Sequence, residues 1–296
     1  MSFWTELNGT SFRVGWKDVG GVRTRYLDTE QGAHVLLFLH GVGGHLEAFI
    51  RNVAAHAQHY RVIALDMLGH GYTDKPEGGY EIADYVRHVV AFLDTMQIEK
   101  VSLIGTSLGG WVSTRIAAQH PDRVRTLTLP GTAGLTASAQ VMERIRTLTS
   151  TAANSDNREG VRKRLEWVIK DPAMVTEEFI EARWRIYSQP SYRRAMPRLM
   201  VLQDPQVRAR NLLQPEELAR IVAPTLIVWT RDDPTGTLED GLRYQSLISG
   251  ARFVLFEQSA HLPQYEEAER FNALHLRFLN DPASVAADEY KGEKTT

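Results

Sequence analysis

Short apolar runs alternate with helical stripes along most of this chain. The runs that predict buried strands cover residues 34–39, 61–65, 100–104, 123–129, 223–229 and 252–256. Between and after them, apolar residues recur at helical spacing at 82–96, from 110 onward and at 266–279. Strands that alternate with helices predict a parallel sheet with right-handed crossovers. The pattern therefore indicates an α/β fold, with a mostly parallel twisted sheet flanked by helices.

The two ends of the chain depart from this alternation. Residues 12–27 alternate between polar and apolar positions around Val19-Gly20-Gly21, which predicts an antiparallel hairpin. The tail at 281–296 is small and polar, and we expect it to fray.

A long segment interrupts the alternation at residues 133–214. It is rich in arginine and in apolar helical stripes, and strands resume after it. Ligands of α/β proteins bind at the carboxyl ends of the strands, so an insertion between core strands predicts a helical lid there. We therefore expect a core formed by residues 1–132 and 215–296, with the lid at 133–214. A separately folded second domain is disfavoured, because the core needs sequence from both sides.

Composition and charge narrow the range of functions. The chain has 34 Lys and Arg against 36 Asp and Glu, a net charge of −2, without a block of like charge. Nothing in it favours nucleic acid or an anionic membrane. The absence of cysteine excludes disulfides, thiol nucleophiles and cysteine-bound metals. The N-terminus lacks a signal-peptide pattern and no apolar run is long enough to span a bilayer, so we expect a cytoplasmic protein.

The segment Gly105-Thr106-Ser107-Leu108-Gly109 carries the most informative chemistry. It lies between a predicted strand and a predicted helix, the context in which Gly-x-Ser-x-Gly forms a strained turn that exposes the serine hydroxyl. The helix N-terminus that follows favours developing negative charge. The alternative is a glycine-rich turn that happens to contain a serine, and the strand and helix on either side disfavour it. We therefore predict that Ser107 is a nucleophile.

A serine nucleophile needs a base and a group that orients the base. Asp233 follows one predicted strand and His261 follows the next, so both belong to the same edge of the sheet as Ser107. The chain order serine, acid, histidine is the one expected for α/β hydrolases. Asp232 is the rival acid. We prefer Asp233 because of its position in the turn that starts at Thr230.

Acyl chemistry also needs hydrogen-bond donors for an oxyanion. The backbone N–H of Leu108, directly after the serine, is one candidate, and that of Val42, two residues after His40, is the second. Glycines at 41, 43 and 44 allow a substrate to approach the backbone. A phosphate-binding loop is disfavoured because its motif is incomplete. No spacing suggests a metal site, and we expect no cofactor.

These motifs resemble the α/β-hydrolase fold superfamily over nearly the whole chain. Within it the sequence looks most like the meta-cleavage product hydrolases, which cut a carbon–carbon bond in ring-opened catechols. The segments that carry this resemblance are residues 130–135, 171–184, 229–233, 238–242 and 260–266. The resemblance implies that Arg183 contacts the carboxylate end of the substrate. It also implies that the substrate is first converted to its keto form.

Two positions depart from the resemblance. The family usually has Asn before the serine and Trp after the histidine, whereas this chain has Thr106 and Leu262. We therefore name Gly41, Thr106, Arg183 and Leu262 as substrate-binding candidates. The alternative for Arg183 is an exposed arginine that forms a surface salt bridge.

The leading hypothesis is hydrolysis of a carbon–carbon bond in a 2-hydroxy-6-oxo-dienoate from aromatic catabolism. The second hypothesis is a carboxylesterase or lactonase with the same triad, which the residues at 106 and 262 motivate. A third is a ligand-binding protein on a hydrolase fold. Dehalogenase and epoxide hydrolase functions are disfavoured, because those relatives place a carboxylate where this chain has Ser107. The expected partners are a small-molecule substrate and further copies of the chain.

Overall fold

A nine-stranded sheet forms the centre of the computed structural model, which describes residues 2–289. The strand order is β1-β2-β4-β3-β5-β6-β7-β8-β9. The strands are β1 (Arg13–Val19), β2 (Val22–Asp28), β3 (Val35–Leu39), β4 (Arg61–Leu65), β5 (Val101–Gly105), β6 (Val124–Pro130), β7 (Thr225–Thr230), β8 (Arg252–Phe256) and β9 (Asp288–Glu289). The strands from β4 to β9 in this order pair in parallel, and β1 and β2 pair antiparallel at one edge. The predicted mostly parallel sheet is confirmed.

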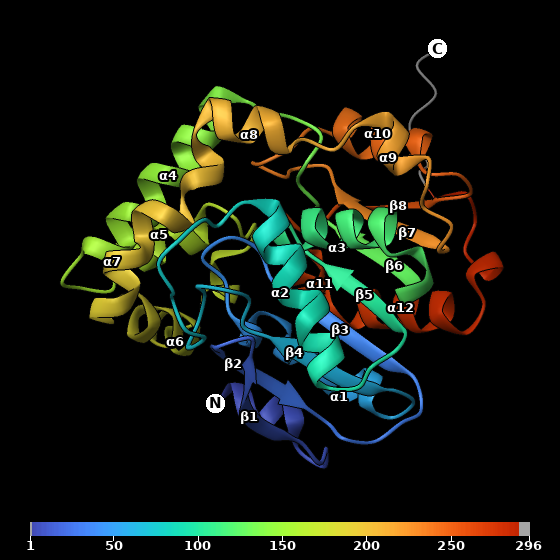
Figure 1. Cartoon of the computed structure of the whole chain (residues 1–296), viewed down its shortest axis with the longest axis horizontal. Coiled ribbons are helices and arrows are strands. Elements are labelled where there is room, and N and C mark those ends of the chain that lie inside the picture. The colour runs from blue at the N-terminus through green and yellow to red at the C-terminus, as the bar shows by residue number, and fades with distance from the viewer. Residues whose placement is uncertain (1, 290–296) are drawn as a thin grey trace.

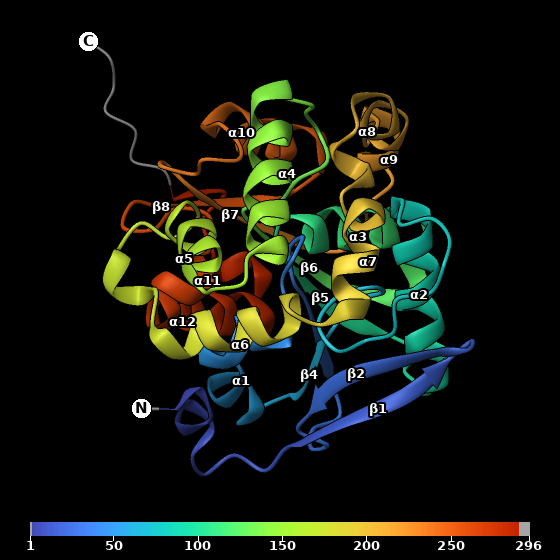
Figure 2. The same ribbon diagram turned by 90° about the vertical axis from the view of Figure 1, so that its left-hand side faces the viewer.

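Helices cover both faces of the sheet. The helices before the inserted segment are α1 (Ile50–Ala57), α2 (Ile82–Thr95) and α3 (Leu108–Gln119), and those after it are α9 (Pro215–Leu218), α10 (Leu238–Leu247), α11 (Pro263–Glu266) and α12 (Ala268–Asn280). Helix α1 packs against α12, and α2 packs against α3. Figure 2 shows the sheet between these two pairs. With both faces covered, the central strands are buried on both sides, which explains their continuous apolar sequence.

The segment between β6 and β7 consists of helices. They are α4 (Ala139–Asn154), α5 (Glu159–Glu166), α6 (Glu177–Tyr187), α7 (Pro190–Leu199) and α8 (Pro205–Asn211). These helices gather at one side of the sheet in Figure 1 and in front of it in Figure 2. Strands β6 and β7 are neighbours in the sheet, so the chain leaves and re-enters the core at adjacent positions. The division into a core and a lid stays a prediction.

The N-terminal hairpin forms where the alternation predicts it. Strands β1 and β2 pair from Arg13 with Asp28 to Val19 with Val22. Gly20 and Gly21 make the turn with φ angles of +60° and +84°, a backbone that residues with a Cβ rarely adopt.

The C-terminal tail is more ordered than we expected. After α12 a short 3-10 helix, η6, covers Pro282–Ser284, and β9 then pairs with Phe253 and Val254 of β8. The prediction of a frayed tail is therefore wrong for these residues, because backbone pairing at a sheet edge does not require an apolar sequence. Residues 290–296, to which the same prediction applied, lie outside the described part. Within the described part, no helix has the length and apolar character needed to cross a bilayer.

A buried charge network fixes the loops that follow β3 and β4. Arg25 on β2 pairs with Glu47 at 2.5 Å and with Asp66 at 3.2 Å. Asp66 also accepts hydrogen bonds from the backbone of Leu46 and Tyr72. Burial opposes the charged forms, but each carboxylate faces the guanidinium and further donors, which is the condition under which buried charges are stable.

Five buried histidines should make the fold sensitive to mild acid. Burial lowers the pKa of His56, His70 and His88 to about 4, from an ordinary value of 6.5, and it holds the pKa of His40 and His275 well below that value. The unfolded chain therefore takes up protons first, and stability present above pH 6.5 is lost as the pH falls toward 4. Each ring contributes a slope of about 1.4 kcal/mol per pH unit in that window.

Urea unfolding at pH 7, 6 and 5 checks this expectation. The free energy of unfolding should fall steadily, and His88→Gln should reduce the slope with pH by about one fifth of the contribution of the five histidines. An unchanged urea m-value would show that both proteins expose the same surface. A stability that stays level between pH 7 and 5 would contradict the account.

Candidate active site

Ser107 occupies a strained turn between β5 and α3. Its φ of +55° and ψ of −117° lie outside the usual regions for a residue with a side chain. The neighbouring backbone holds it there, because Ser107 N donates to Gly131 O at 3.0 Å and Ala133 N donates to Ser107 O at 3.2 Å. Strain of this kind costs of the order of 1–3 kcal/mol and persists where the surroundings fix it. The turn thus presents the hydroxyl at the carboxyl end of β5.

Glycine at position 109 lets α3 start directly against the sheet. A Cβ on Gly109 would overlap the carbonyl group of Leu39 at the end of β3. The first turn of α3 therefore reaches the strand ends only because this residue has no side chain. The sequence motif reflects this close approach.

Asp233 and His261 form a buried pair at the same edge. The Nδ1 atom of His261 lies 2.8 Å from Oδ2 and 3.0 Å from Oδ1 of Asp233, and their side chains are 7% and 1% exposed. A ring that donates Nδ1–H to the carboxylate keeps Nε2 free to accept a proton. Asp232, the rival acid, is 52% exposed and pairs with Lys170 instead. No hydrogen bond joins the Ser107 hydroxyl to His261 among the described residues, although both side chains line one cavity.

Thr235 contacts both residues of this pair, and the sequence analysis did not predict it. Its backbone N–H and its hydroxyl each donate to Asp233 Oδ1 at 2.8 Å. The hydroxyl also lies 3.0 Å from His261 Nδ1. These bonds hold the carboxylate of Asp233 in place beside the imidazole. The signal was the spacing Asp-Pro-Thr, since an aspartate often accepts from the backbone two residues later.

The loop after β3 brings Val42 beside Ser107. Val42, Ser107 and Leu108 line the same cavity, and neither Val42 N–H nor Leu108 N–H donates to another described residue. His40 braces the loop: its Nδ1 donates to Gly41 O at 2.8 Å, and its Nε2 accepts from Met67 N at 3.1 Å. Burial, assisted by the nearby His70, holds the pKa of His40 well below its usual range, so the ring is neutral and can accept that bond.

The same loop contacts the inserted helices. The Tyr187 hydroxyl on α6 donates to Gly43 O at 2.9 Å. Gly43 has a φ of +70°, and a Cβ there would overlap this hydroxyl. A glycine is therefore needed to seat α6 against the loop that carries Val42.

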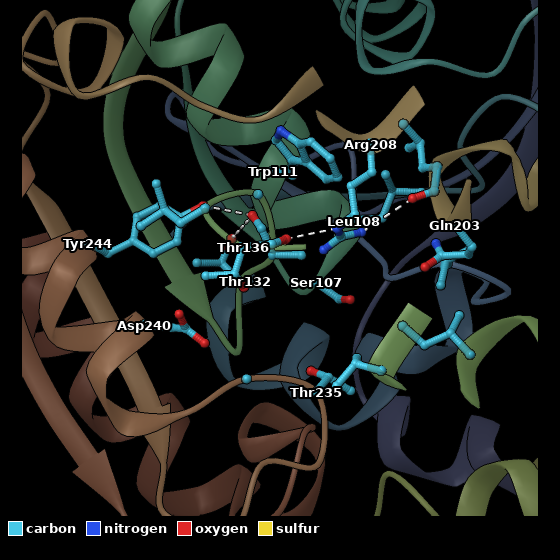
Figure 3. Close-up of a pocket in the computed structure, with 18 of the residues that line it drawn as sticks. Ser107, Leu108, Trp111, Thr132, Thr136, Gln203, Arg208, Thr235, Asp240 and Tyr244 are labelled. Atoms are coloured by element: carbon cyan, nitrogen blue, oxygen red, sulfur yellow. Dashed lines mark hydrogen bonds between the residues drawn. The ribbon is translucent and has the colours of Figure 1, made fainter. Parts of the chain in front are cut away.

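Two cavities meet at Ser107. The Arg208 cavity is lined by Val42, Ser107, Leu108, Trp111, Thr132, Ala133, Gly134, Leu135, Thr136, Val141, Ile145, Leu202, Gln203, Arg208, Trp229, Thr235, Gly236, Asp240 and Tyr244. The Arg183 cavity is lined by His40, Gly41, Val42, Gly44, Ala48, Phe49, Thr106, Ser107, Ile145, Arg164, Val168, Arg183, Thr235, His261, Leu262 and Gln264. Figure 3 shows Ser107 beneath Leu108 in the first of these. A bound molecule can extend to both sides of the serine.

The Arg183 cavity contains two buried arginines without a carboxylate partner. Arg183 is 5% exposed, its Nε lacks a hydrogen-bond partner, and it forms no ion pair within residues 2–289. Arg164 is equally buried, bonds only Thr149 through Nε at 3.3 Å, and leaves Nη1 unpaired. Burial, with the charge of Arg183 nearby, lowers the pKa of Arg164 to about 10. Unpaired buried charges are costly, so the cavity is suited to an anion.

All four substrate-binding candidates line the Arg183 cavity. They are Gly41, Thr106, Arg183 and Leu262. The Thr106 hydroxyl and both polar atoms of the Gln264 side chain are buried there without partners. Arg183 is buried and unpaired, so the alternative of an exposed surface arginine is wrong. Sequence reasoning missed Arg164 and Gln264.

The assembled groups suit attack on a carbonyl group. The hydroxyl of Ser107, an imidazole fixed by a carboxylate, and the residues that carry two unused backbone N–H groups line the two cavities that meet at Ser107, with a positive region on one side. Among the residues that the structure describes, no group of three His, Asp or Glu side chains is arranged to hold a metal ion.

Comparison with known proteins shows which protein family the chain resembles. The model of the alpha/beta hydrolase fold family matches residues 34–268. The chain is 31% identical to a 2-hydroxy-6-oxo-6-(2'-aminophenyl)hexa-2,4-dienoic acid hydrolase of Metapseudomonas resinovorans, over 95% of this chain and 96% of that one. It is 30% identical to a 2-hydroxy-6-oxo-2,4-heptadienoate hydrolase of Pseudomonas putida, over 88% and 93%.

A solved structure agrees with these relatives. The meta-cleavage product hydrolase from Pseudomonas fluorescens IP01 (CumD), complexed with acetates, superposes with a TM-score of 0.79 at 28% identity. The alignment covers 91% of this chain and 98% of that one.

Removal of the unpaired charge at Arg183 should stabilise the protein and weaken anion binding. We expect Arg183→Met to raise the free energy of unfolding by about 1–3 kcal/mol, because a buried cation without a partner opposes folding. Benzoate should raise the melting temperature of the wild type more than that of the variant, which keeps Arg164 in the same cavity. Arg185→Met is the matched control, because Arg185 lies on the same helix, is 67% exposed and pairs with Glu181. Equal stabilisation of wild type and Arg183→Met by benzoate would contradict this interpretation.

Proposed function

The chain belongs to the α/β-hydrolase fold family, and we propose that it is a serine-dependent hydrolase that cleaves a carbon–carbon bond in a 2-hydroxy-6-oxo-dienoate acid. The observation that carries the proposal is the meeting of two cavities at Ser107, one of which holds unpaired arginines. The relatives act on acids of this kind by their names. In the proposed binding mode, the carboxylate end of the substrate lies in the Arg183 cavity and its 6-oxo carbon lies at Ser107.

The proposed roles of the active-site residues follow from this binding mode. His261, oriented by Asp233, takes a proton from Ser107 or from a water molecule, which attacks the 6-oxo carbon. The backbone N–H groups of Val42 and Leu108 stabilise the oxyanion that forms. Collapse of this intermediate breaks the C5–C6 bond. When water attacks, the C6 fragment leaves directly as a carboxylic acid. When Ser107 attacks, the C6 fragment stays as an ester of the serine, which a water molecule then hydrolyses to the acid. In both cases the C5 fragment takes a proton to give a hydroxypentadienoate.

The keto form of the substrate makes this cleavage feasible. In that form the electron pair left at C5 is conjugated through C3 and C4 with the 2-oxo group, so the negative charge moves toward the carboxylate end. Arg183 and Arg164 lie in the cavity where this charge arrives. A buried cation without a protein partner stabilises such charge more than a solvated one does. We infer that Arg164 supports the head of the substrate in place of the usual Asn and Trp, where this chain has Thr106 and Leu262.

Cytoplasmic location and self-association stay predictions of the sequence. An esterase or lactonase would use the same serine, acid and histidine. The two functions differ in what occupies the Arg183 cavity, since a neutral ester leaves both arginines unpaired.

Loss of the dienolate absorbance should test the function directly. We expect wild-type protein to remove the absorbance of freshly prepared ring-fission acids, and Ser107→Ala to be slower by about 10³-fold or more. Ser113→Ala is the matched control, because Ser113 is a buried serine on α3, the helix that follows Ser107, and lines neither cavity. It should keep the wild-type rate within about twofold.

Neutral p-nitrophenyl esters are measured in the same assay. Turnover of these esters, with no reaction of any ring-fission acid, would replace the proposal by the esterase or lactonase hypothesis. Saturable binding without turnover of either class would replace it by a ligand-binding function.

A further inference from the structure

A third buried arginine lies on the other side of Ser107. Arg208 on α8 is 8% exposed and lines the Arg208 cavity. The binding mode proposed above places the side group of the 6-oxo carbon in this cavity. Its Nε donates to Thr136 O at 2.8 Å and its Nη1 to Leu202 O at 3.4 Å. The remaining nitrogen, Nη2, has no hydrogen-bond partner among the described residues. Figure 3 shows the side chain passing between Trp111 and Ser107.

No carboxylate neutralises Arg208. It forms no ion pair within the described part of the chain, and its guanidinium packs over the Trp111 ring at 5.1 Å. Burial lowers the pKa of Arg208. A cation held in this way, with one free donor edge toward a cavity, is suited to a bidentate or single charge-assisted bond from an anion.

The polar groups of this cavity are divided between two sides. Gln203 lies beside Arg208 and has its Oε1 buried without a partner, so its amide can turn to donate or accept. Asp240 lies on the opposite side with Tyr244, and its carboxylate accepts from Thr237 N at 2.9 Å. The walls between them are apolar, including Leu135, Val141 and Trp229. The cavity therefore has a positive end at Arg208 and a negative end at Asp240.

We propose that the side group on the 6-oxo carbon ends in a carboxylate, which Arg208 and Gln203 bind. This inference rests on the proposed function, because it uses the proposed binding mode at Ser107 to place the side group. The preferred substrate is then a dicarboxylic ring-fission acid, with one carboxylate at Arg183 and the other at Arg208. Cleavage by water releases the side group as a dicarboxylic acid.

A matched series of substrates tests the proposal. Ring-fission acids with ω-carboxyalkyl side groups of one to four methylenes are compared with isopropyl-terminated side groups of the same length and shape, and with ω-aminoalkyl ones. We expect kcat/KM of the best carboxylated member to exceed that of its neutral isostere by about 10- to 100-fold, the range of a charge-assisted bond. The amino series should be slowest, because its ammonium group would face Arg208.

The variants separate recognition from structure. Arg208→Met should remove the preference for the carboxylate and leave the neutral isostere within about threefold, whereas Arg208→Lys should keep part of it. Arg115→Met is the matched control, because Arg115 also anchors the insertion, through Asn211 O at 2.6 Å, and lines neither cavity. Its loss should change both substrates by the same factor.

Several outcomes would overturn the proposal. These are a wild type that prefers the neutral or the amino series, and an Arg208→Met variant that slows both members of a pair equally. Calorimetric binding of the product acids gives a test that does not need turnover: the wild type should bind the dicarboxylic acid more tightly than the branched monoacid, and Arg208→Met should not. If no substrate is cleaved while this difference in binding holds, the proposed function fails and the assignment of Arg208 stands; equal binding overturns the assignment.

Discussion

The strained backbone at Ser107 is the constraint on which the other parts of the site depend. A φ of +55° holds only because Gly131 and Ala133 bond the serine backbone and because Gly109 lets α3 meet the end of β3. This close approach brings the first N–H of α3 toward the same space as Val42. Substitution of Gly109 would move α3 outward and separate the hydroxyl from both N–H groups at once. The strain and the chemistry are thus properties of one turn.

The charges around this turn are arranged for a ligand more than for stability. In the core network, Arg25 has two carboxylate partners and holds together the loops that follow β3 and β4. Arg164, Arg183 and Arg208 are equally buried, yet none has a carboxylate partner among the described residues. A protein selected only for stability would replace such cations by apolar side chains. Their presence on both sides of Ser107 indicates where negative charge of the ligand lies.

Much of this architecture could be predicted from local sequence. Buried parallel strands have continuous apolar runs, and the hairpin turn needs the positive φ of Gly20 and Gly21, so both features are visible in the chain itself. Ser107, Asp233 and His261 each follow a predicted strand, which is enough to place them at one edge of a parallel sheet. The pairing of β9 was missed, because an edge strand bonded through its backbone leaves little trace in side chains. Arg164 and Arg208 were missed for a different reason. An arginine in an amphipathic helix is normally predicted to be exposed to solvent, and its burial here depends on how the inserted helices pack together.

A crystal structure of Ser107→Ala with a dicarboxylic ring-fission acid bound would show where both acid groups of the ligand lie. We expect one carboxylate within hydrogen-bond distance of Arg183, the 6-oxo oxygen between the N–H groups of Val42 and Leu108, and the second carboxylate at Arg208. A ligand bound in the reverse direction, or one whose acid groups avoid both arginines, would contradict this expectation.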